Sequence, residues 1–423
     1  MGYSSFLHLT QTGIILMVCN VETLGQVFTP EIVVDFMVSL RQNQGTVLEP
    51  SCGDGAFLKH LGSEAIGIEL DALHCPPRAL NMDFFDYTGS GFDTIIGNPP
   101  YVRHQKITPE TKAKLDMELF DGRANLYLFF IKKCVDMLNE DGELIFITPR
   151  EFMTSTSSVK LNKWLYQQGR LTHYVEFGDT KVFKGASPNV IVWRYQKTKS
   201  FSFTFHTALF NVNYCKVKKL EDLTHVTWQR GSTQSHQGQI SFTSLATPTL
   251  ALGTIATVKV GAASGADSLF VAKVNLSTFY DEAIEFVCSH TRATGATARM
   301  LYNIKHPGLA WSKLRLMHRK IRTFDETNWW QWGRAYPHTE APRVYVNVRT
   351  RQADPFFLHP GLAFTGSVLA IFPKNPSVDL TQFCRDLNDV DWEAQGFKCG
   401  GRVLFSQRGL ENTLLPETFE KYL

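Results

Sequence analysis

The sequence lacks any grouping of cysteines that would hold a metal ion. Its 423 residues include eight cysteines, which are scattered with no C-x-x-C pair and no Cys/His group at zinc spacing. A chain of this length does not need disulfides to stabilise its core. We therefore expect no metal site and a reducing, cytoplasmic environment.

Long hydrophobic runs are also missing. The apolar run at residues 13–19 is much shorter than the roughly 20 residues that span a bilayer as a helix. It follows no charged segment and precedes no clear small-residue cleavage site, so it does not fit an export signal. The sequence predicts no membrane contact and an unstructured leader over residues 1–20.

The chain has little net charge, because 43 Lys and Arg face 40 Asp and Glu. With 43% apolar and 20% charged residues, it has the composition of a globular protein rather than a disordered one. The two halves differ, however. Residues 1–229 carry 22 basic and 24 acidic side chains, whereas residues 230–423 carry 21 and 16. The basic second half makes a polyanion a candidate partner.

Short apolar runs alternate with helical patterns in the first half of the chain. Strands are predicted at residues 46–49, 65–70, 92–97, 142–148 and 190–195, and helices at 31–40, 126–138 and 161–168. This alternation predicts an α/β fold with a doubly wound, mostly parallel sheet. At the first helix, Thr29 is the expected N-cap and Pro30 the first helical residue.

The pattern changes after about residue 201. Thr, Ser and Gln become dense over residues 236–249, which predicts a linker, and short strands with Gly/Pro turns follow. We therefore expect a catalytic or ligand-binding domain over residues 21–235. A mixed α/β domain is expected over residues 236–423.

A glycine-containing turn follows the first predicted strand. The strand ends at Glu49, Gly53-Asp54-Gly55 forms a G-x-G turn, and a helix is expected to open near Leu58. Glycines at such a turn let backbone amides approach a ligand at the carboxyl end of the sheet. The third glycine of a dinucleotide fingerprint is absent, which argues against a bound pyrophosphate. Alone, the motif is equally consistent with a tight strand–helix turn.

Acids recur at the ends of the next strands. Glu69 is placed to accept both hydroxyls of a ribose. Asp83 is placed to accept from an adenine amino group, and the neighbouring Phe84 ring can stack on the base. Each acid alone could be a solvated strand end. Together with the G-x-G turn, they predict a pocket for an adenosine.

Asn98-Pro99-Pro100-Tyr101 directly follows the strand predicted at residues 92–97. Two prolines remove two amide donors and stiffen the backbone. The side-chain oxygen of Asn98 and the carbonyl of Pro99 are then acceptors at the rim of the sheet. Two acceptors suit a planar NH2 group with two hydrogens, and Tyr101 offers a ring face for the same substrate. A plain turn is the alternative interpretation.

Taken together, these motifs resemble the gamma-class N6-adenine DNA methyltransferases, the Taq-type modification enzymes of type II restriction–modification systems. In that family a T-P motif, an LEP-x-x-G-x-G-x-F-L motif and NPPY occur in this order, matched here by residues 26–30, 48–58 and 98–101. The resemblance is specific over about residues 21–200 and diffuse afterwards. Only fifteen residues separate Asp83 from Asn98, so the DNA-recognition domain is expected at residues 236–423.

The resemblance implies that S-adenosylmethionine is the cofactor and that a flipped adenine in double-stranded DNA is the substrate. The implied cofactor-binding residues are Thr29, Glu49, Gly53, Glu69, Asp83, Phe84 and Pro100. The implied residues around the target adenine are Asn98, Pro99, Tyr101 and Phe183, where the Tyr101 and Phe183 rings would enclose the base between them. Lys184 is the nearest basic residue after Phe183. The alternative interpretation of Phe183 is a core aromatic.

The second half supplies candidate contacts to DNA. They are basic side chains in two clusters: Lys313, Arg315, Arg319 and Lys320, then Arg349 and Arg351. Such clusters suit phosphate contacts, and Arg also suits guanine edges; a solvated basic face is the alternative. The resemblance further implies a bacterial, nucleoid-associated monomer, and a cognate restriction endonuclease on a separate chain.

Other classes of enzyme use the same chemistry at NPPY-type motifs. Methyltransferases that act on a guanine amino group of ribosomal RNA, or on a protein glutamine amide, also hold a planar NH2 group between Asn and a Pro carbonyl. The T-P motif before the cofactor loop and the long C-terminal domain favour DNA over these alternatives. A DNA-binding module with a degenerate cofactor site is disfavoured by the intact acids and NPPY.

Overall fold

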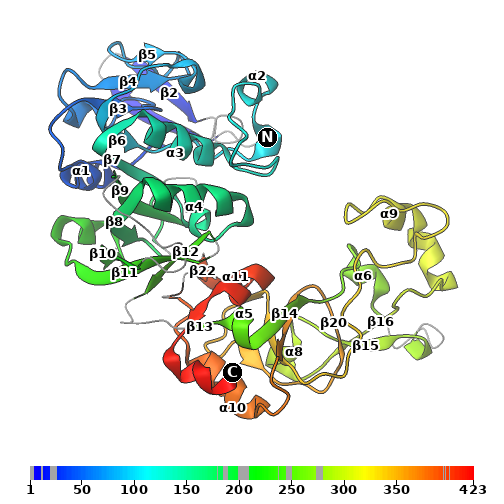
Figure 1. The fold of residues 1–423 in the computed structure, drawn as a ribbon. Coiled ribbons are helices and arrows are strands. Elements are labelled where there is room, and N and C mark those ends of the chain that lie inside the picture. The colour runs from blue at the N-terminus through cyan, green and yellow to red at the C-terminus, as the bar shows by residue number, and fades with distance from the viewer. Residues whose placement is uncertain are drawn as a thin grey trace. The chain divides into compact units, whose positions relative to one another are not determined.

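The structure is a computed structural model. It describes residues 4–10, 13–19, 26–178, 180–183, 189–198, 209–236, 238–243, 250–272, 280–393, 395, 397–399 and 401–423. The chain divides into two compact units, Met1–Leu245 and Ala246–Leu423, which run from blue to green and from green to red in Figure 1. Each unit has its own hydrophobic core.

A large sheet is the framework of the first unit (Figure 1). Among the described strands its order is β12-β11-β10-β8-β9-β7-β6-β3-β4-β5. The bounds are β3 Val47–Glu49, β4 Ile66–Glu69, β5 Leu80–Asn81, β6 Phe92–Gly97, β7 Leu138–Pro149, β8 Gly169–Glu176, β9 Val190–Lys197, β10 Leu209–Lys216, β11 Gln229–His236 and β12 Gln239–Thr243. The part β7-β6-β3-β4-β5 is parallel throughout. The predicted α/β fold is confirmed.

Helices cover both faces of this sheet, as a doubly wound fold requires. Their bounds are α1 Glu31–Ser39, α2 Pro109–Lys112, α3 Leu126–Met137 and α4 Val159–Gln168, with 3-10 turns η1 Leu58–His60, η2 Phe84–Asp86, η3 His104–Lys106, η4 Arg150–Met153, η5 Thr156–Ser158 and η6 Leu220–His225. α3 and α4 contribute to one apolar core and α1 to another. Strands buried between two such layers are apolar along their whole length, and Ile95, Ile96 and Ile145 are indeed fully buried.

The strand order reverses beside β3. β4 and β5 lie on one side of it and β6 and β7 on the other. In open α/β sheets, ligands bind outside the carboxyl ends of the strands at this reversal point. The fold therefore brings Glu49, Glu69 and Asn98, which end or follow β3, β4 and β6, to one edge of the sheet.

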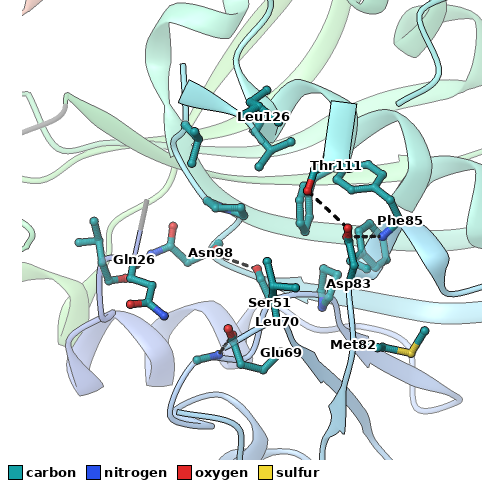
Figure 2. A pocket seen from close by; sticks show the side chains of 18 of the residues that line it. Gln26, Ser51, Glu69, Leu70, Met82, Asp83, Phe85, Asn98, Thr111 and Leu126 are labelled. Carbon is teal, nitrogen blue, oxygen red and sulfur yellow. Dashed lines mark hydrogen bonds between the residues drawn. The ribbon is translucent and has the colours of Figure 1, made fainter. Parts of the chain in front are cut away.

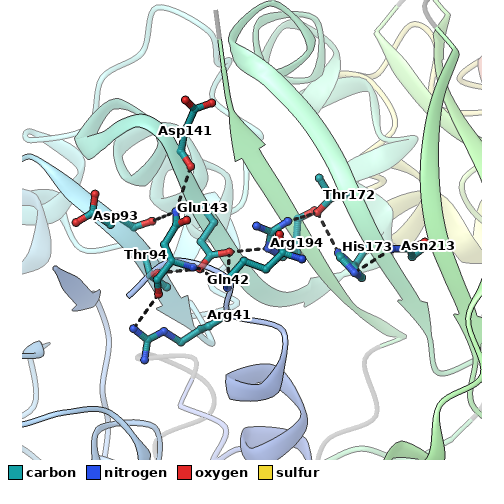
Figure 3. A network of polar contacts seen from close by, with 11 residues as sticks. Arg41, Gln42, Asp93, Thr94, Asp141, Glu143, Thr172, His173, Arg194 and Asn213 are labelled. Carbon is teal, nitrogen blue, oxygen red and sulfur yellow. Dashed lines mark hydrogen bonds and ion pairs between the residues drawn. The ribbon is translucent and has the colours of Figure 1, made fainter. Parts of the chain in front are cut away.

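A buried polar network joins strands towards the amino ends of β6 and β7 (Figure 3). The Glu143 carboxylate accepts from the backbone amides of Gln42 and Asn43, from the Thr94 hydroxyl at 2.9 Å and from the Arg194 guanidinium at 2.6 Å. Glu143 and Arg194 are both almost fully buried. Removing one partner of such a buried pair would leave the other charge uncompensated, which strongly destabilises a fold.

Four predictions about the first unit are wrong. The leader is expected to be unstructured, but β1 Ser4–Thr10 and β2 Gly13–Cys19 pair as an antiparallel hairpin, and β2 contains the strand-forming Ile14, Ile15 and Val18. Within the expected linker, Gln239–Thr243 alternates polar and apolar residues and forms β12 against β11. The helix expected after Gly55 is only the 3-10 turn η1. Thr29 does not cap α1; Pro30 occupies that position, and no side chain caps the helix.

The second unit consists of short strands and helices, as predicted. Its described sheets are β14-β21-β17-β19, β16-β15-β20, β18-β23-β22 and β13-β24. The strands are β13 Leu250–Ala251, β14 Ala256–Val260, β15 Ile284–Val287, β16 Ala298–Met300, β17 Val344–Asn347, β18 Arg349–Thr350, β19 Phe356–Phe357, β20 Ala363–Phe364, β21 Val368–Pro373, β22 Lys398–Cys399, β23 Arg402–Leu404 and β24 Leu414–Leu415. The helices are α5 Leu252–Ile255, α6 Asp267–Phe270, α8 Thr291–Thr294, α9 Lys313–Met317, α10 Leu380–Asp389 and α11 Gln407–Asn412, with η7 Pro307–Ser312 and η8 Glu417–Tyr422.

Candidate active site

A pocket lies at the carboxyl ends of the parallel strands, where the strand order reverses. It encloses about 890 Å³ of empty space, part of it open to solvent. Figure 2 shows Gln26 and Asn98 on one side of it and Asp83 with Phe85 on the other. The predicted residues that line it are Gly53, Glu69, Asp83, Phe84, Asn98 and Pro100.

The G-x-G turn and Glu69 form one wall. Gly53 and Gly55 have φ angles of 51° and 78°, in the left-handed region that favours glycine. The Gly53 amide donates to Glu69 Oε2 at 2.8 Å, and the Asp71 amide donates to Oε1 at 2.8 Å. Each carboxylate oxygen can accept a second hydrogen bond. Glu69 is thus held by backbone amides with capacity left for a pair of ligand hydroxyls.

Glu49 lies behind this wall and does not itself line the pocket. Its side chain is 1% exposed. Burial, together with the nearby Asp54 carboxylate, raises the pKa of Glu49 well above its usual value. Its Oε2 has no hydrogen-bond partner among the described residues. A buried acid with an unused oxygen suits an amine or a cationic group of a ligand.

Asp83 and Phe84 form the aromatic side of the pocket. Asp83 Oδ1 accepts from the Phe85 amide at 3.0 Å, and Oδ2 accepts from Lys114 Nζ at 3.0 Å. The Phe84 ring stacks on Phe130, with centroids 4.7 Å apart. Phe85 and Phe130 also line the pocket. A flat aromatic ligand would find both an acceptor and ring faces here.

Asn98 is held in one orientation by the chain segment before α1. Its Nδ2 donates to the Val27 carbonyl at 3.0 Å and to Thr29 Oγ1 at 3.1 Å. The Ser51 hydroxyl donates to the Asn98 backbone carbonyl at 3.1 Å. Asn98 Oδ1 is buried and has no partner among the residues described. Because the amide nitrogen is occupied, the side chain offers its oxygen as an acceptor.

Thr29 therefore positions Asn98 and does not line the pocket. Pro99 is buried and also lies outside the lining, whereas its neighbour Pro100 lines it. Thr29 contacts the Asn98 side chain in space, and Pro99 follows Asn98 in the chain. The structure brings the N-terminal T-P motif and the NPPY motif into direct contact across 69 positions of sequence.

Tyr101 and Phe183 lie next to each other but do not enclose a gap. Their ring centroids are 6.3 Å apart and the rings meet edge to face at 63°. The Tyr101 hydroxyl donates to the Ile147 carbonyl, and burial raises the pKa of Tyr101. A base held between two parallel rings needs a separation of about 7–8 Å between the ring planes, which is twice the stacking distance. The predicted base sandwich thus requires these rings to turn; Lys184 lies outside the described residues.

Sequence reasoning missed a polar group at the pocket rim. Gln26 Nε2 and His74 Nδ1 each lie 2.8 Å from Asp71 Oδ2. Although burial raises the pKa of Asp71, the hydrogen bonds from Gln26 and His74 lower it overall. This group ties the segment at Gln26 to the loop after β4. The only signal in the sequence is the acid Asp71, two residues after Glu69. Its role cannot be inferred from the sequence, because its partner Gln26 lies 45 positions away.

The predicted DNA contacts of the second unit divide into four kinds. Arg319 is buried, because its guanidinium donates to the carbonyls of Ser264 and Trp329 and lies 3.7 Å from the centre of the Phe324 ring. Burial lowers the pKa of Arg319 to about 10. It therefore holds a loop, and its prediction as a DNA contact is wrong. The others are Lys313, which pairs with Glu326, the exposed Arg315 and Lys320, and Arg349 and Arg351, which line a pocket.

The part of the chain that the structure describes holds no cluster of metal ligands. Within it, no three His, Cys, Asp or Glu side chains gather closely enough to bind an ion. None of its helices combines the length and apolar content that crossing a bilayer requires.

Residues 70–183, which carry most of the pocket, match the Eco57I restriction-modification methylase family. The chain resembles restriction–modification methyltransferases. It is 32% identical to Type II methyltransferase M.HincII of Haemophilus influenzae, over 48% of this chain and 42% of that protein. It is 36% identical to Type II methyltransferase M.TthHB8I of Thermus thermophilus, over 41% and 45%. The matched region spans less than half the length of both relatives.

A solved structure supports the fold along nearly the whole chain. The type IIL restriction–modification enzyme MmeI, in complex with DNA, superposes with a TM-score of 0.57 at 11% identity, covering 92% of this chain and 66% of that one. At this identity the likeness concerns the fold alone. It extends the comparison beyond residues 70–183 into both units.

The residues present fit S-adenosylmethionine. Glu69 has capacity for two ribose hydroxyls, and Asp83 with the rings of Phe84 and Phe130 suits an adenine. The cofactor expected from the sequence is supported by this donor set and by the matched family.

Proposed function

We propose that the protein is a site-specific DNA methyltransferase of a restriction–modification system. It transfers a methyl group from S-adenosylmethionine to the N6 amino group of an adenine flipped out of double-stranded DNA, and restriction is carried by a separate endonuclease. The matched family and relatives support the class of enzyme. The observation that carries the proposal is the Oδ1 of Asn98 at the pocket, which is buried and has no partner within the described part of the chain.

Bound S-adenosylmethionine supplies an activated methyl group. The amino nitrogen of adenine is a poor nucleophile, because its lone pair is delocalised into the ring. Hydrogen bonds from its two protons to Asn98 Oδ1 and the Pro99 carbonyl favour a pyramidal nitrogen with its lone pair directed at the methyl carbon. Acceptors that are already in place stabilise the charge that develops on that nitrogen.

The target base needs a surface to replace its stacking in the duplex. Tyr101 follows the two proline residues, and Phe183 contacts its ring. Stacking on an aromatic ring contributes roughly 1–3 kcal/mol per base, which offsets part of the cost of flipping. The edge-to-face pair must open for this, so the base-binding geometry forms only when the base arrives.

The test is incubation with labelled S-adenosylmethionine and plasmid DNA, followed by mapping of the modified base. Asn98→Ala is expected to lower methylation at least about 100-fold, as loss of one preorganised hydrogen-bonding group does, with cofactor binding retained. Asn139→Ala is the matched control: Asn139 also donates its amide to a backbone carbonyl, that of Gly91, but at the opposite end of β6. Label in ribosomal RNA or in a protein glutamine, with none in DNA, would refute the proposal.

A further inference from the structure

Four arginines of the second unit line one pocket. They are Arg292, Arg349, Arg351 and Arg402. The pocket encloses about 630 Å³, much of it open to solvent, and its other described lining residues are small or polar and include no acid. Arg349 and Arg351 are neighbours in sequence, but Arg292 and Arg402 come from segments 110 positions apart, so only the fold brings all four together.

Three of these arginines lie on the same face of the small sheet β18-β23-β22. β18 pairs antiparallel with β23, with Arg349 opposite Leu404 and Thr350 opposite Val403. Continuing the register by one residue places Arg351 opposite Arg402. Side chains directly opposite each other, and those two apart along a strand, share a face of a sheet. Arg349, Arg351 and Arg402 therefore share one face.

Arg292 reaches the same pocket from α8. Its Nε donates to the Asp354 backbone carbonyl at 3.1 Å, which leaves the terminal guanidinium nitrogens available. The Asn347 side chain donates to the Ser289 carbonyl at 2.8 Å and so ties β17 to the segment before α8. Within the described ranges, none of the four arginines forms an ion pair. By contrast, Arg343 of the same unit donates to three backbone carbonyls.

Four like charges around one pocket repel each other, and no carboxylate in its lining offsets this. Such an arrangement costs stability in the free protein and is relieved by an anion. Guanidinium groups match a phosphate in geometry as well as in charge. Arg349 and Arg351 are exposed and Arg292 and Arg402 are half-buried, so an anion from solvent can reach all four side chains.

We propose that Arg292, Arg349, Arg351 and Arg402 form a phosphate-binding pocket that holds the backbone of the DNA substrate. The assignment of the phosphate to DNA rests on the proposed function. The binding of phosphate by the pocket is independent of it. The four side chains act as a positioning clamp on the duplex and read no base.

The test compares duplex binding of the full chain and two double variants by fluorescence anisotropy over a range of salt concentrations. Arg349→Gln with Arg351→Gln is expected to weaken binding about tenfold, as loss of hydrogen bonds to a charged group does. It should also reduce the slope of log K against log salt by about 0.9 for each phosphate that is no longer neutralised. Arg385→Gln with Arg408→Gln removes two exposed arginines from α10 and α11 of the same unit and is expected to leave both unchanged.

Further measurements separate folding from binding. Arg349→Lys with Arg351→Lys keeps the charge and should retain most of the salt slope. The Gln double variant should melt at or above the wild-type temperature in low salt without DNA, since repulsion is removed, and should bind S-adenosylmethionine normally. Equal slopes for the two Gln double variants would overturn the proposal. A loss confined to one DNA sequence would also overturn it, because it would indicate base reading.

Inorganic phosphate distinguishes the two sources of the ligand. It is expected to raise the melting temperature of the wild type but not of the Gln double variant. If phosphate does so while duplex binding is unaffected by the substitutions, the pocket serves a free phosphate and the clamp on DNA is refuted. If the wild type binds no duplex at all, the proposed function fails, and stabilisation by phosphate still decides whether the pocket binds this anion.

Discussion

The two ends of the parallel sheet bury polar groups in opposite ways. Towards the amino ends, Glu143 accepts from two backbone amides, from Thr94 and from Arg194, so its carboxylate is fully used. At the carboxyl ends, Glu49 Oε2 and Asn98 Oδ1 are buried without partners among the described residues. An unpaired buried acceptor costs free energy. The comparison indicates that one end of the sheet supports the structure and the other is completed by ligands.

The sharpest test of this comparison replaces one acid at each end. Glu143→Ala should lower the free energy of unfolding by about 3–5 kcal/mol, because Arg194 is left buried without its partner. Glu49→Gln should change it by less than about 1 kcal/mol but weaken S-adenosylmethionine binding about tenfold. Denaturant unfolding and titration calorimetry measure the two effects. If both substitutions lowered the free energy of unfolding equally, the proposed difference between the two ends of the sheet would be refuted.

The structural end should also respond to pH. Burial, and then the charge of Arg194, lowers the pKa of His173 to about 4. An unfolded histidine titrates near pH 6.5, so the unfolded chain takes up this proton first. The free energy of unfolding should therefore fall by up to about 3 kcal/mol as the pH drops from about 6.5 to about 4, and no further. His173→Gln should flatten this part of the pH profile of stability; an unchanged profile would contradict the assignment.

The ligand end should respond to the form of the substrate. Tyr101→Ala and Phe183→Ala each remove a ring worth about 1–3 kcal/mol of stacking. The loss in kcat/KM should be about tenfold or more on duplex DNA and smaller on DNA whose target adenine is already unpaired. Comparing the two substrates in single-turnover assays measures this difference. Equal losses on both would argue against a base held between the two rings.

The smallest expected effect concerns Thr29, which holds the Asn98 side chain in its orientation. Thr29→Val removes an acceptor from Asn98 Nδ2 and should lower kcat about fivefold to tenfold, the cost of one hydrogen bond, with little change in cofactor affinity. Thr46→Val is the matched control, since the Thr46 hydroxyl donates to a backbone carbonyl at the other end of the sheet. A fall in cofactor affinity as large as the fall in kcat would mean that Thr29 binds the cofactor directly.

The sequence was sufficient to predict features that lie within a few residues of each other. It did not predict contacts between residues that are far apart in the chain. Strand runs, the acids that end them and NPPY each lie within a few residues, so their order was enough to place Glu69, Asp83 and Asn98 at one pocket. The contact of Thr29 with Asn98 crosses 69 positions, and only the closed fold creates it. The burial of Arg319 also depends in part on a distant contact, because the Ser264 carbonyl that accepts from its guanidinium lies 55 positions away in sequence.

The contact between Asn98 and the segment at Val27 has a consequence for judging related sequences. The stretch that matches the methylase family, residues 70–183, contains the whole NPPY motif but not the residues that aim its asparagine. A relative could keep that stretch intact, lose the earlier segment and survive as an inactive cofactor-binding remnant. Telling working enzymes from such pseudoenzymes therefore depends on some of the first thirty residues as well as on the motif.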